Sequence, residues 1–149
     1  MKASVKHLVR RTWLSITDSR STGADLKIAR DVLNLREFEL WERMQSVDQR
    51  HSVRVFSRFR SLLPDSTREE CAAVLLHDVG KSVARLGTLA RIGATIGVLR
   101  TRRAERYRDH EAIGLDLAIA QNLDEQVIAA MSGRGRGVFI HAFHLADNE

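Results

Sequence analysis

The chain has 149 residues, of which 44% are hydrophobic, and this suits one compact domain rather than two. Twenty-four Lys and Arg against nineteen Asp and Glu give a net charge of +5, which suits a phosphate-bearing partner or an anionic surface. A single cysteine, Cys71, excludes an internal disulfide and fits a reducing cytoplasm, and no apolar run approaches the ~20 residues of a membrane-spanning helix.

Helix-favouring residues dominate the composition. Aromatic residues make up only 5% of the chain, Pro64 is its one proline, and Ala, Leu, Arg and Glu are plentiful. We therefore expect an all-α fold.

The N-terminal residues 1–16 are basic and amphipathic, without the apolar run and cleavage site of a secretory signal. They could lie on an anionic membrane, or form an exposed arm or first helix docked by its apolar residues, which is the more common arrangement. A polar break follows over 17–23. We divide the chain into an arm and linker, 1–23, and a helical domain, 24–149.

Two helices are expected at the start of this domain. An Ala/Leu/Ile pattern begins at Ala24, and a second helix follows Asn34, which forms a capping box with Glu37. The second helix carries Phe38, Trp41 and Met44 at helical spacing, and Trp41 is expected in the core.

The next helix is expected to start with Ser46 as its cap and to end near Pro64, whose ring would clash with a continuing helix. Its inward stripe is His51, Val55, Phe59 and Leu62.

Ser66 and Glu69 then predict a capping box for another helix, which ends near Gly80. The stripe of this helix is Cys71, Val74, Leu75 and Asp78.

The second half of the chain continues the helical pattern. Residues 84–99 predict a long apolar helix or a broken pair, and a basic connector over 100–109 follows it. A helix from His110 carries Ile113 and Leu117 on its inward stripe. Asn122 and Glu125 predict the start of a short helix. A Gly/Arg loop then precedes a last helix, which has Ile140, Phe143 and Asp147 on one face.

Four of these stripes include a polar side chain of a metal-ligand type: His51, Asp78, His110 and Asp147. One inward histidine is usually a hydrogen-bonded core residue, but four such groups together favour a shared ligand. His77 precedes Asp78 directly, and neighbouring helical residues point about 100° apart, so both could contact one ion. Imidazole and carboxylate ligands favour Mn, Fe, Zn or Ni, and the absence of thiolates favours a catalytic metal over a structural zinc.

These residues resemble the HD-domain metal-dependent phosphohydrolases, whose pattern is a His, a His-Asp pair and a distant Asp, all on helices. The pattern reads here as His51, then His77 and Asp78 in "LLHDVGK", then Asp147, and it covers about residues 46–149. The resemblance implies an HD-like bundle of about six to eight helices that binds one divalent metal, including Mg among the candidates, through these four residues.

A second metal is also implied. The sequence "HEAIG" at 110–114 is similar to a motif of the HD-GYP subgroup, in which the histidine, here His110, serves a second ion. The histidine pair that the subgroup places further on is replaced by Met131 and Ser132, and His141 or His144 could substitute for it. The GYP signature is absent, which argues against a cyclic-dinucleotide phosphodiesterase.

The expected chemistry is hydrolysis of a small phosphorylated metabolite or nucleotide by a metal-activated water. Asp78 would bind the metal and assist proton removal from the water, as in the family, and Lys81 would stabilise the phosphate unless it is a solvated surface lysine. Arg108, with the other arginines of the connector, could bind phosphate at the opening of the site or belong to a solvated loop.

Two other functions remain open. The chain could be a metal- or nucleotide-binding regulatory module with little turnover, or, with more ligands than the sequence supplies, a di-iron oxygenase of the same fold. Tyr107 is the only aromatic residue in the basic connector, so nucleic-acid binding has no strong signal.

Overall fold

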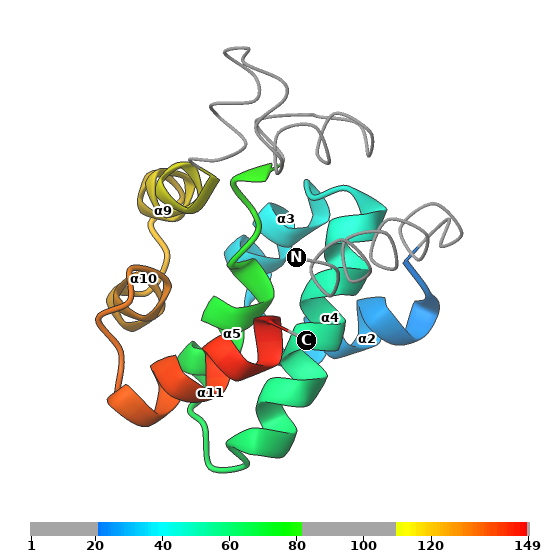
Figure 1. Ribbon diagram of the computed structural model, residues 1–149. Coiled ribbons are helices and arrows are strands. Elements are labelled where there is room, and N and C mark those ends of the chain that lie inside the picture. Colours follow the sequence, from blue (N-terminus) through cyan, green and yellow to red (C-terminus); the bar gives the residue numbers. More distant parts are fainter. Residues whose placement is uncertain (1–20, 82–109, 149) are drawn as a thin grey trace, which may run out of the picture.

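Seven helices and no strands make up the part of the chain that the computed structural model describes, residues 21–81 and 110–148. The expected all-α fold is confirmed, and Figure 1 shows the arrangement. The helices are α2 (Gly23–Val32), α3 (Leu35–Glu42), α4 (Ser46–Leu62), α5 (Arg68–Leu76), α9 (His110–Ala120), α10 (Glu125–Met131) and α11 (Gly137–Asp147).

Several predicted segments lie outside the described residues. These are the basic arm over 1–16, the apolar helix over 84–99 and the whole basic connector over 100–109, including Arg108. None of the helices in the described ranges is long and apolar enough to cross a membrane.

Helix α5 lies at the centre of the bundle, with α4 on one side, α9 and α10 on the other and α11 in front (Figure 1). Every residue from Glu70 to Leu76 is buried, so this helix has no solvent-exposed face along that stretch. A helix that is apolar on all sides belongs in a core, where neighbours remove its whole surface from water. The position of its C-terminal end is therefore set by packing.

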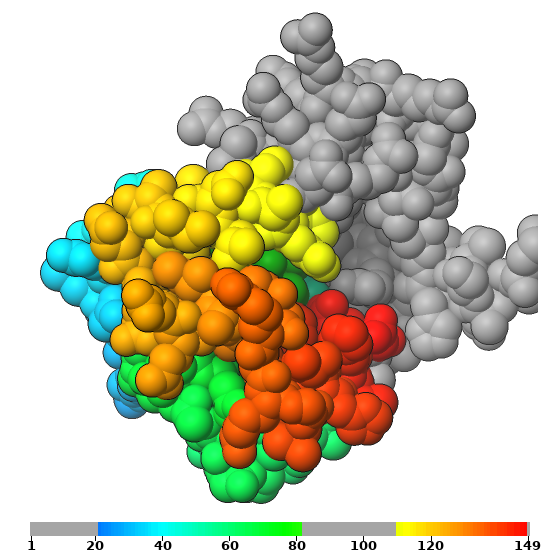
Figure 2. All heavy atoms as spheres, turned by 90° about the vertical axis from the view of Figure 1, so that its left-hand side faces the viewer, coloured from blue at the N-terminus to red at the C-terminus, as the bar shows by residue number. Residues whose placement is uncertain are grey.

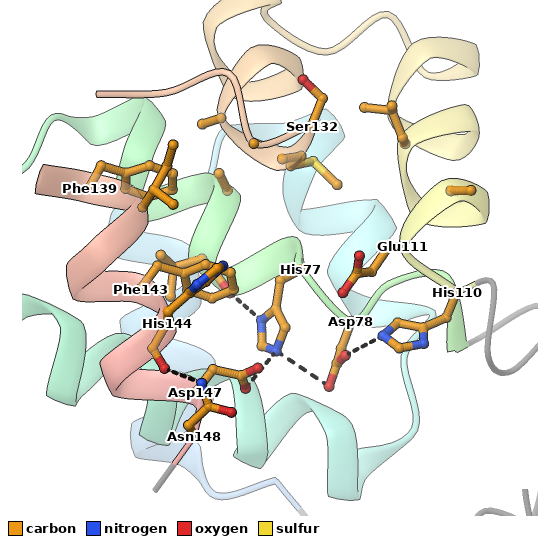
Figure 3. Close-up of a pocket in the computed structure, with 18 residues that line it drawn as sticks. His77, Asp78, His110, Glu111, Ser132, Phe139, Phe143, His144, Asp147 and Asn148 are labelled. Atoms are coloured by element: carbon orange, nitrogen blue, oxygen red, sulfur yellow. Dashed lines mark hydrogen bonds and ion pairs between the residues drawn. The ribbon is translucent and has the colours of Figure 1, made fainter. Parts of the chain in front are cut away.

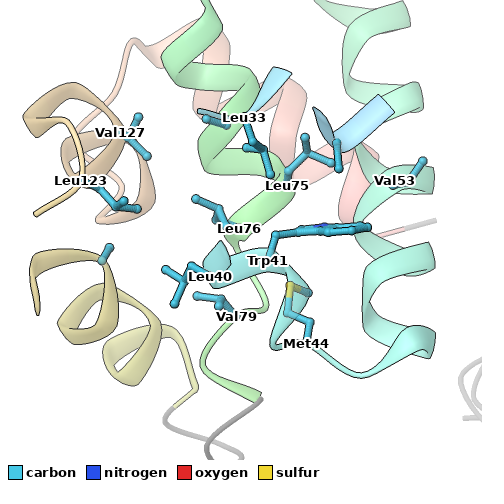
Figure 4. Packing of buried hydrophobic residues seen from close by; sticks show 13 residues of the cluster. Leu33, Leu40, Trp41, Met44, Val53, Leu75, Leu76, Val79, Leu123 and Val127 are labelled. Carbon is cyan, nitrogen blue, oxygen red and sulfur yellow. The ribbon is translucent and has the colours of Figure 1, made fainter. Parts of the chain in front are cut away.

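Two apolar clusters meet at α5. The first joins it to α2, α3 and the C-terminal half of α9 with α10, and Trp41 lies fully buried in it as expected (Figure 4). The Trp41 indole Nε1–H donates to Ser52 Oγ at 3.0 Å, so the buried ring has a polar partner. The second cluster joins α5 to α4, α10 and α11, and its buried members are Val55, Phe59, Cys71, Ala73, Val74, Ala130, Phe139, Ala142 and Ala146.

The capping box at Asn34 and Glu37 is confirmed, but the one predicted at Ser66 and Glu69 is wrong by one residue. Thr67 caps α5 with Glu70 as its partner. The Ser66 hydroxyl instead accepts a hydrogen bond from Arg60 Nη1 at 2.9 Å.

Two other helix starts also differ from the prediction. Gln45 is the N-cap of α4, without a capping hydrogen bond from its side chain, and Ser46 is already the first helical residue. Asp124 caps α10 by accepting from the Gln126 N–H, whereas Asn122 adopts a left-handed φ of 51° in the turn after α9. Asn is one of the residues that tolerates this conformation, which explains its place in the turn.

One member of the predicted α4 stripe does not reach the core. Leu62 is 50% exposed, because Leu63 packs against the second cluster at that end of the helix instead. His51, Val55 and Phe59 do face the interior, as expected.

Two ion pairs fix the start of α5. Arg68 binds the fully buried Glu37 of α3 through both terminal nitrogens, at 2.7 and 3.3 Å. Arg136, just before α11, binds Glu70 at 2.7 Å through two nitrogens. Bidentate pairs of this kind have a defined geometry, so they orient α3 and α11 relative to α5.

A close backbone crossing lies at the other end of α5, between Gly80 and the first turn of α9. A Cβ atom on Gly80 would lie 1.8 Å from the His110 carbonyl oxygen and 2.8 Å from the Gly114 nitrogen. Only glycine allows this approach, because any side chain would push α9 away. The crossing therefore determines where His110 lies.

We predict that Gly80→Ala destabilises the protein by about 3 kcal/mol, the upper end of what overpacking costs, because backbone atoms rather than flexible side chains oppose the new methyl group. The free energy of unfolding in urea measures the effect. Gly137→Ala is the matched control, since a Cβ there meets nothing within 4 Å. Equal unfolding midpoints for the two variants would contradict the close crossing.

Candidate metal centre

The structure brings five of the predicted site residues together from four parts of the fold. His51 comes from α4, His77 and Asp78 from the turn after α5, His110 from the first residue of α9, and Asp147 from the last residue of α11. Figure 3 shows His77, Asp78, His110 and Asp147 directed toward one another.

The ligand-type atoms are spaced as neighbours around one ion would be. Asp147 Oδ1 lies 3.2 Å from His51 Nε2 and 3.5 Å from His77 Nε2. Asp78 Oδ2 lies 3.5 Å from His77 Nε2 and 3.8 Å from His51 Nε2. Ligand atoms about 2.1 Å from a shared ion are separated by about 3.0–3.4 Å at octahedral and tetrahedral angles. The ligand atoms of His51, His77 and Asp78 all lie within 4.8 Å of one another and could hold one ion, and Asp147 lies beside both histidines.

His77 offers a nitrogen with no hydrogen-bond partner. Its Nδ1 lies 2.7 Å from the Val74 carbonyl oxygen, so Nδ1 carries the hydrogen and donates it. In the neutral ring Nε2 then has a lone pair, and this buried atom has no hydrogen bond. A lone pair facing two carboxylates is repulsive, so a cation, either a proton or a metal ion, is needed between them.

The electrostatics of His77 agree with this reading. Burial lowers the pKa of His77, but Asp78 and Asp147 outweigh burial and hold the pKa above its ordinary value. The site therefore attracts positive charge at this nitrogen. A backbone carbonyl that fixes the tautomer is also the usual support of a metal-binding histidine.

His51 behaves differently from His77. Burial is the main effect on it, and its pKa lies below the ordinary value although Asp147 and Asp78 act in the other direction. A neutral imidazole is the form that binds a metal, so His51 is suited to be a ligand without losing a proton.

Asp78 is 2% exposed and is contacted by several positively charged or hydrogen-donating groups. Lys81 Nζ contacts Asp78 Oδ2, and His110 Nε2 lies 3.3 Å from Oδ1. Burial alone would raise the pKa of Asp78, but His77 and Lys81 bring the pKa well below its ordinary value. The carboxylate is therefore ionised, which is the form that binds a cation.

Asp147 belongs to a well-anchored helix end. Arg58 of α4 donates to the Ala146 carbonyl oxygen at 3.3 Å, and Asn148 Nδ2 donates to the His144 carbonyl oxygen at 2.7 Å. These bonds satisfy carbonyl groups that a helix end otherwise leaves unpaired. Burial would raise the pKa of Asp147, but the hydrogen bond with His51 and the charge interaction with His77 hold it far below the ordinary value.

The proposed second-metal ligands are less complete. His110 lies against Asp78, but the grouped ligand atoms in the described part of the chain are those of His51, His77 and Asp78. His141 and His144, the suggested substitutes, are both exposed and do not belong to this group.

A cavity of about 510 Å³ extends from the cluster between α5, α9, α10 and α11. Figure 2 shows the hollow, in which α5 is visible between α9 and α11. Its wall includes Glu111, Ser132 and Phe143, which were not predicted from the sequence to line the site. The sequence does contain an indication of two of these positions, because Glu111 follows His110 directly and Phe143 lies one helical turn before Asp147.

Comparisons with known proteins add no assignment. No family model, no curated protein and no solved structure matches the chain significantly. The resemblance to the HD family therefore stays a prediction that depends on the ligand residues and their spacing.

We predict that Mn²⁺ or Ni²⁺ at about 100 times its dissociation constant stabilises metal-free protein by about 2.7 kcal/mol, which raises the melting temperature by roughly 5–10 °C. Asp78→Ala should abolish this shift because it removes a buried anionic ligand. His141→Ala is the control, since this histidine lies on α11 outside the cluster. An equal rise of the melting temperature in the unchanged protein and in the Asp78→Ala variant would show that the metal does not bind at this site.

A second prediction concerns the anchoring of Asp147. Arg58→Ala should weaken Mn²⁺ binding about tenfold, because the last turn of α11 loses its bond to α4 and Asp147 is held less firmly against His51. Isothermal titration of the metal-free variant gives the affinity. Arg60→Ala removes an arginine of the same helix that contacts Pro64 and Ser66 instead, and its Mn²⁺ affinity should match that of the unchanged protein. Equal affinities in all three proteins would show that the contact does not position Asp147.

Proposed function

We propose that the protein is a metal-dependent phosphohydrolase of the HD type that acts on a small phosphorylated molecule. The observation that carries the proposal is the buried, unpartnered Nε2 of His77, which faces the carboxylates of Asp78 and Asp147. A divalent ion there would satisfy the imidazole and both anions at once. The order of His51, His77, Asp78 and Asp147 along the chain is that of the HD pattern.

The donor set fits a catalytic ion better than a structural one. The candidate donors are the imidazoles of His51 and His77 and the carboxylate of Asp78, with the Asp147 carboxylate beside both imidazoles. None is a thiolate, and the adjoining cavity leaves room for water and substrate. When bound, such an ion lowers the pKa of a coordinated water and polarises a phosphoryl oxygen.

Asp78 has the position and charge for proton transfer. Its ionised carboxylate has one oxygen directed to His77 and Lys81 and the other to His110. We propose that Asp78 binds the ion and also accepts the proton from the attacking water. A base must lie within hydrogen-bond reach of the proton that it takes, and a ligand of the same ion meets that requirement.

Lys81 supplies a positive charge beside the cluster. Its side chain is 12% exposed and contacts Asp78, which argues against a fully solvated surface lysine. An ammonium group in this position would stabilise the charge that develops on the phosphoryl oxygens. The role predicted for Arg108 remains a prediction, since that residue is outside the described ranges.

The proposal is tested by metal analysis of protein purified without added metal, followed by a screen of phosphate monoesters and nucleotides with Mn²⁺, Mg²⁺ and Ni²⁺. We expect inorganic phosphate release that falls about a thousandfold in Asp78→Ala, since about 4 kcal/mol of transition-state stabilisation depends on it. His141→Ala should retain full activity because its exposed side chain is not in the cluster.

Two results would replace the proposal. Tight nucleotide binding without turnover would indicate a regulatory module. Two bound irons without turnover of any phosphoester would indicate an oxygenase.

A further inference from the structure

The cavity beside the metal centre has two ends of different chemistry. His77, Asp78, His110 and Asp147 lie at one end, and Figure 3 shows Ser132 and Phe139 well away from Asp78. Between them the wall is formed by carbon-rich side chains of α9, α10 and α11, among which Leu115, Met131, Ile140 and Phe143 are half-buried. A molecule with its phosphate at the cluster would thus extend its remaining part along an apolar wall.

This wall begins directly at the metal ligands. The Phe143 ring contacts the His77 ring edge to face, with centroids 5.3 Å apart. On its other side Phe143 stacks with Phe139, with centroids 6.1 Å apart and planes 5° from parallel. The half-buried Phe143 is therefore the part of the apolar wall nearest the cluster.

Positive charge is missing from the part of the cavity wall that the structure describes. Its lining includes no Lys and no Arg. Arg134 donates its Nε–H to the Ser132 hydroxyl at 2.9 Å, but its own side chain is outside the lining. Glu111 adds a negative charge, and Figure 3 shows it between α9 and His77. A carboxylate at this place repels a neighbouring negative charge.

We infer that this site takes phosphate monoesters of apolar alcohols. The inference rests on the proposed phosphohydrolase function and narrows its substrate class. Hydrolysis breaks the P–O bond to the apolar alcohol, and water supplies the new oxygen of inorganic phosphate. The proton that Asp78 accepts from that water passes to the alcohol oxygen. The volume of about 510 Å³ is within the usual range of small-molecule sites.

The test compares esters with similar leaving groups, all of primary alcohols: naphthylmethyl phosphate, hexyl phosphate and glycerol phosphate, with ATP as a polyphosphate. For the Mn²⁺-loaded protein we expect kcat/KM at least about tenfold higher for the naphthylmethyl ester than for glycerol phosphate or ATP. Equal values, or a preference for the polar esters, would overturn the inference while the phosphohydrolase function stands.

A wall variant gives a second readout. Met131→Gln keeps the size of a half-buried lining residue but makes it polar, and it should raise KM for naphthylmethyl phosphate about tenfold while KM for glycerol phosphate stays the same. Leu145→Gln makes a similar change at a 49% exposed position of α11 outside the lining, and it should alter neither KM. If Met131→Gln changed both KM values equally, the apolar wall would not select the substrate.

Binding of non-hydrolysable analogues separates failure of this inference from failure of the proposed function. If no phosphoester is hydrolysed, the phosphohydrolase proposal falls. The inferred ligand class is then supported if naphthylethyl phosphonate binds the Mn²⁺-loaded protein at least about tenfold more tightly than dihydroxybutyl phosphonate. It is overturned if the two bind equally or not at all.

Discussion

The burial of α5 on every side is the constraint on which the other features depend. A helix without an exposed face cannot rotate or slide without opening the core, and two bidentate ion pairs, Glu37 with Arg68 and Glu70 with Arg136, fix its start. The turn that follows therefore leaves the core at a defined point. His77 and Asp78 lie in that turn, so their positions follow from the packing of the helix before them.

The candidate centre combines charges that would be unfavourable separately. Asp78 and Asp147 are ionised in a mostly enclosed space, and the fold provides imidazoles and an ammonium group around Asp78 instead of water. The buried Nε2 of His77, in contrast, has no hydrogen-bond partner within the protein. The arrangement is thus formed before an ion enters, which reduces the reorganisation that binding requires. Its cavity then joins this polar end to an aromatic wall through the contact of Phe143 with His77.

The sequence allowed the all-α fold and the grouping of the ligand residues to be predicted, because His51, Asp78 and Asp147 stand on otherwise apolar helix faces where an isolated charge is costly. The local capping patterns predicted the helix starts less accurately. Ser66 and Thr67 are both good caps, so the capping pattern alone does not distinguish them, and Thr67 is the one that caps α5. The buried acids Glu37 and Glu70 resemble ordinary first-turn residues, and their partners lie 31 and 66 positions away. The cavity wall depends on how α9, α10 and α11 meet, which no single helical pattern contains.

The distance along the chain between His51 and Asp147 has a consequence for folding. These two residues are 96 positions apart and come within 3.2 Å of one another. An ion held by both would close a loop of that length and act as a removable cross-link between α4 and α11. In the chain-entropy treatment a permanent link across such a loop restricts the unfolded ensemble by about 4–5 kcal/mol. A protein with one cysteine cannot be stabilised in this way by an internal disulfide. The metal ion would therefore provide the cross-link that disulfides provide in small secreted domains.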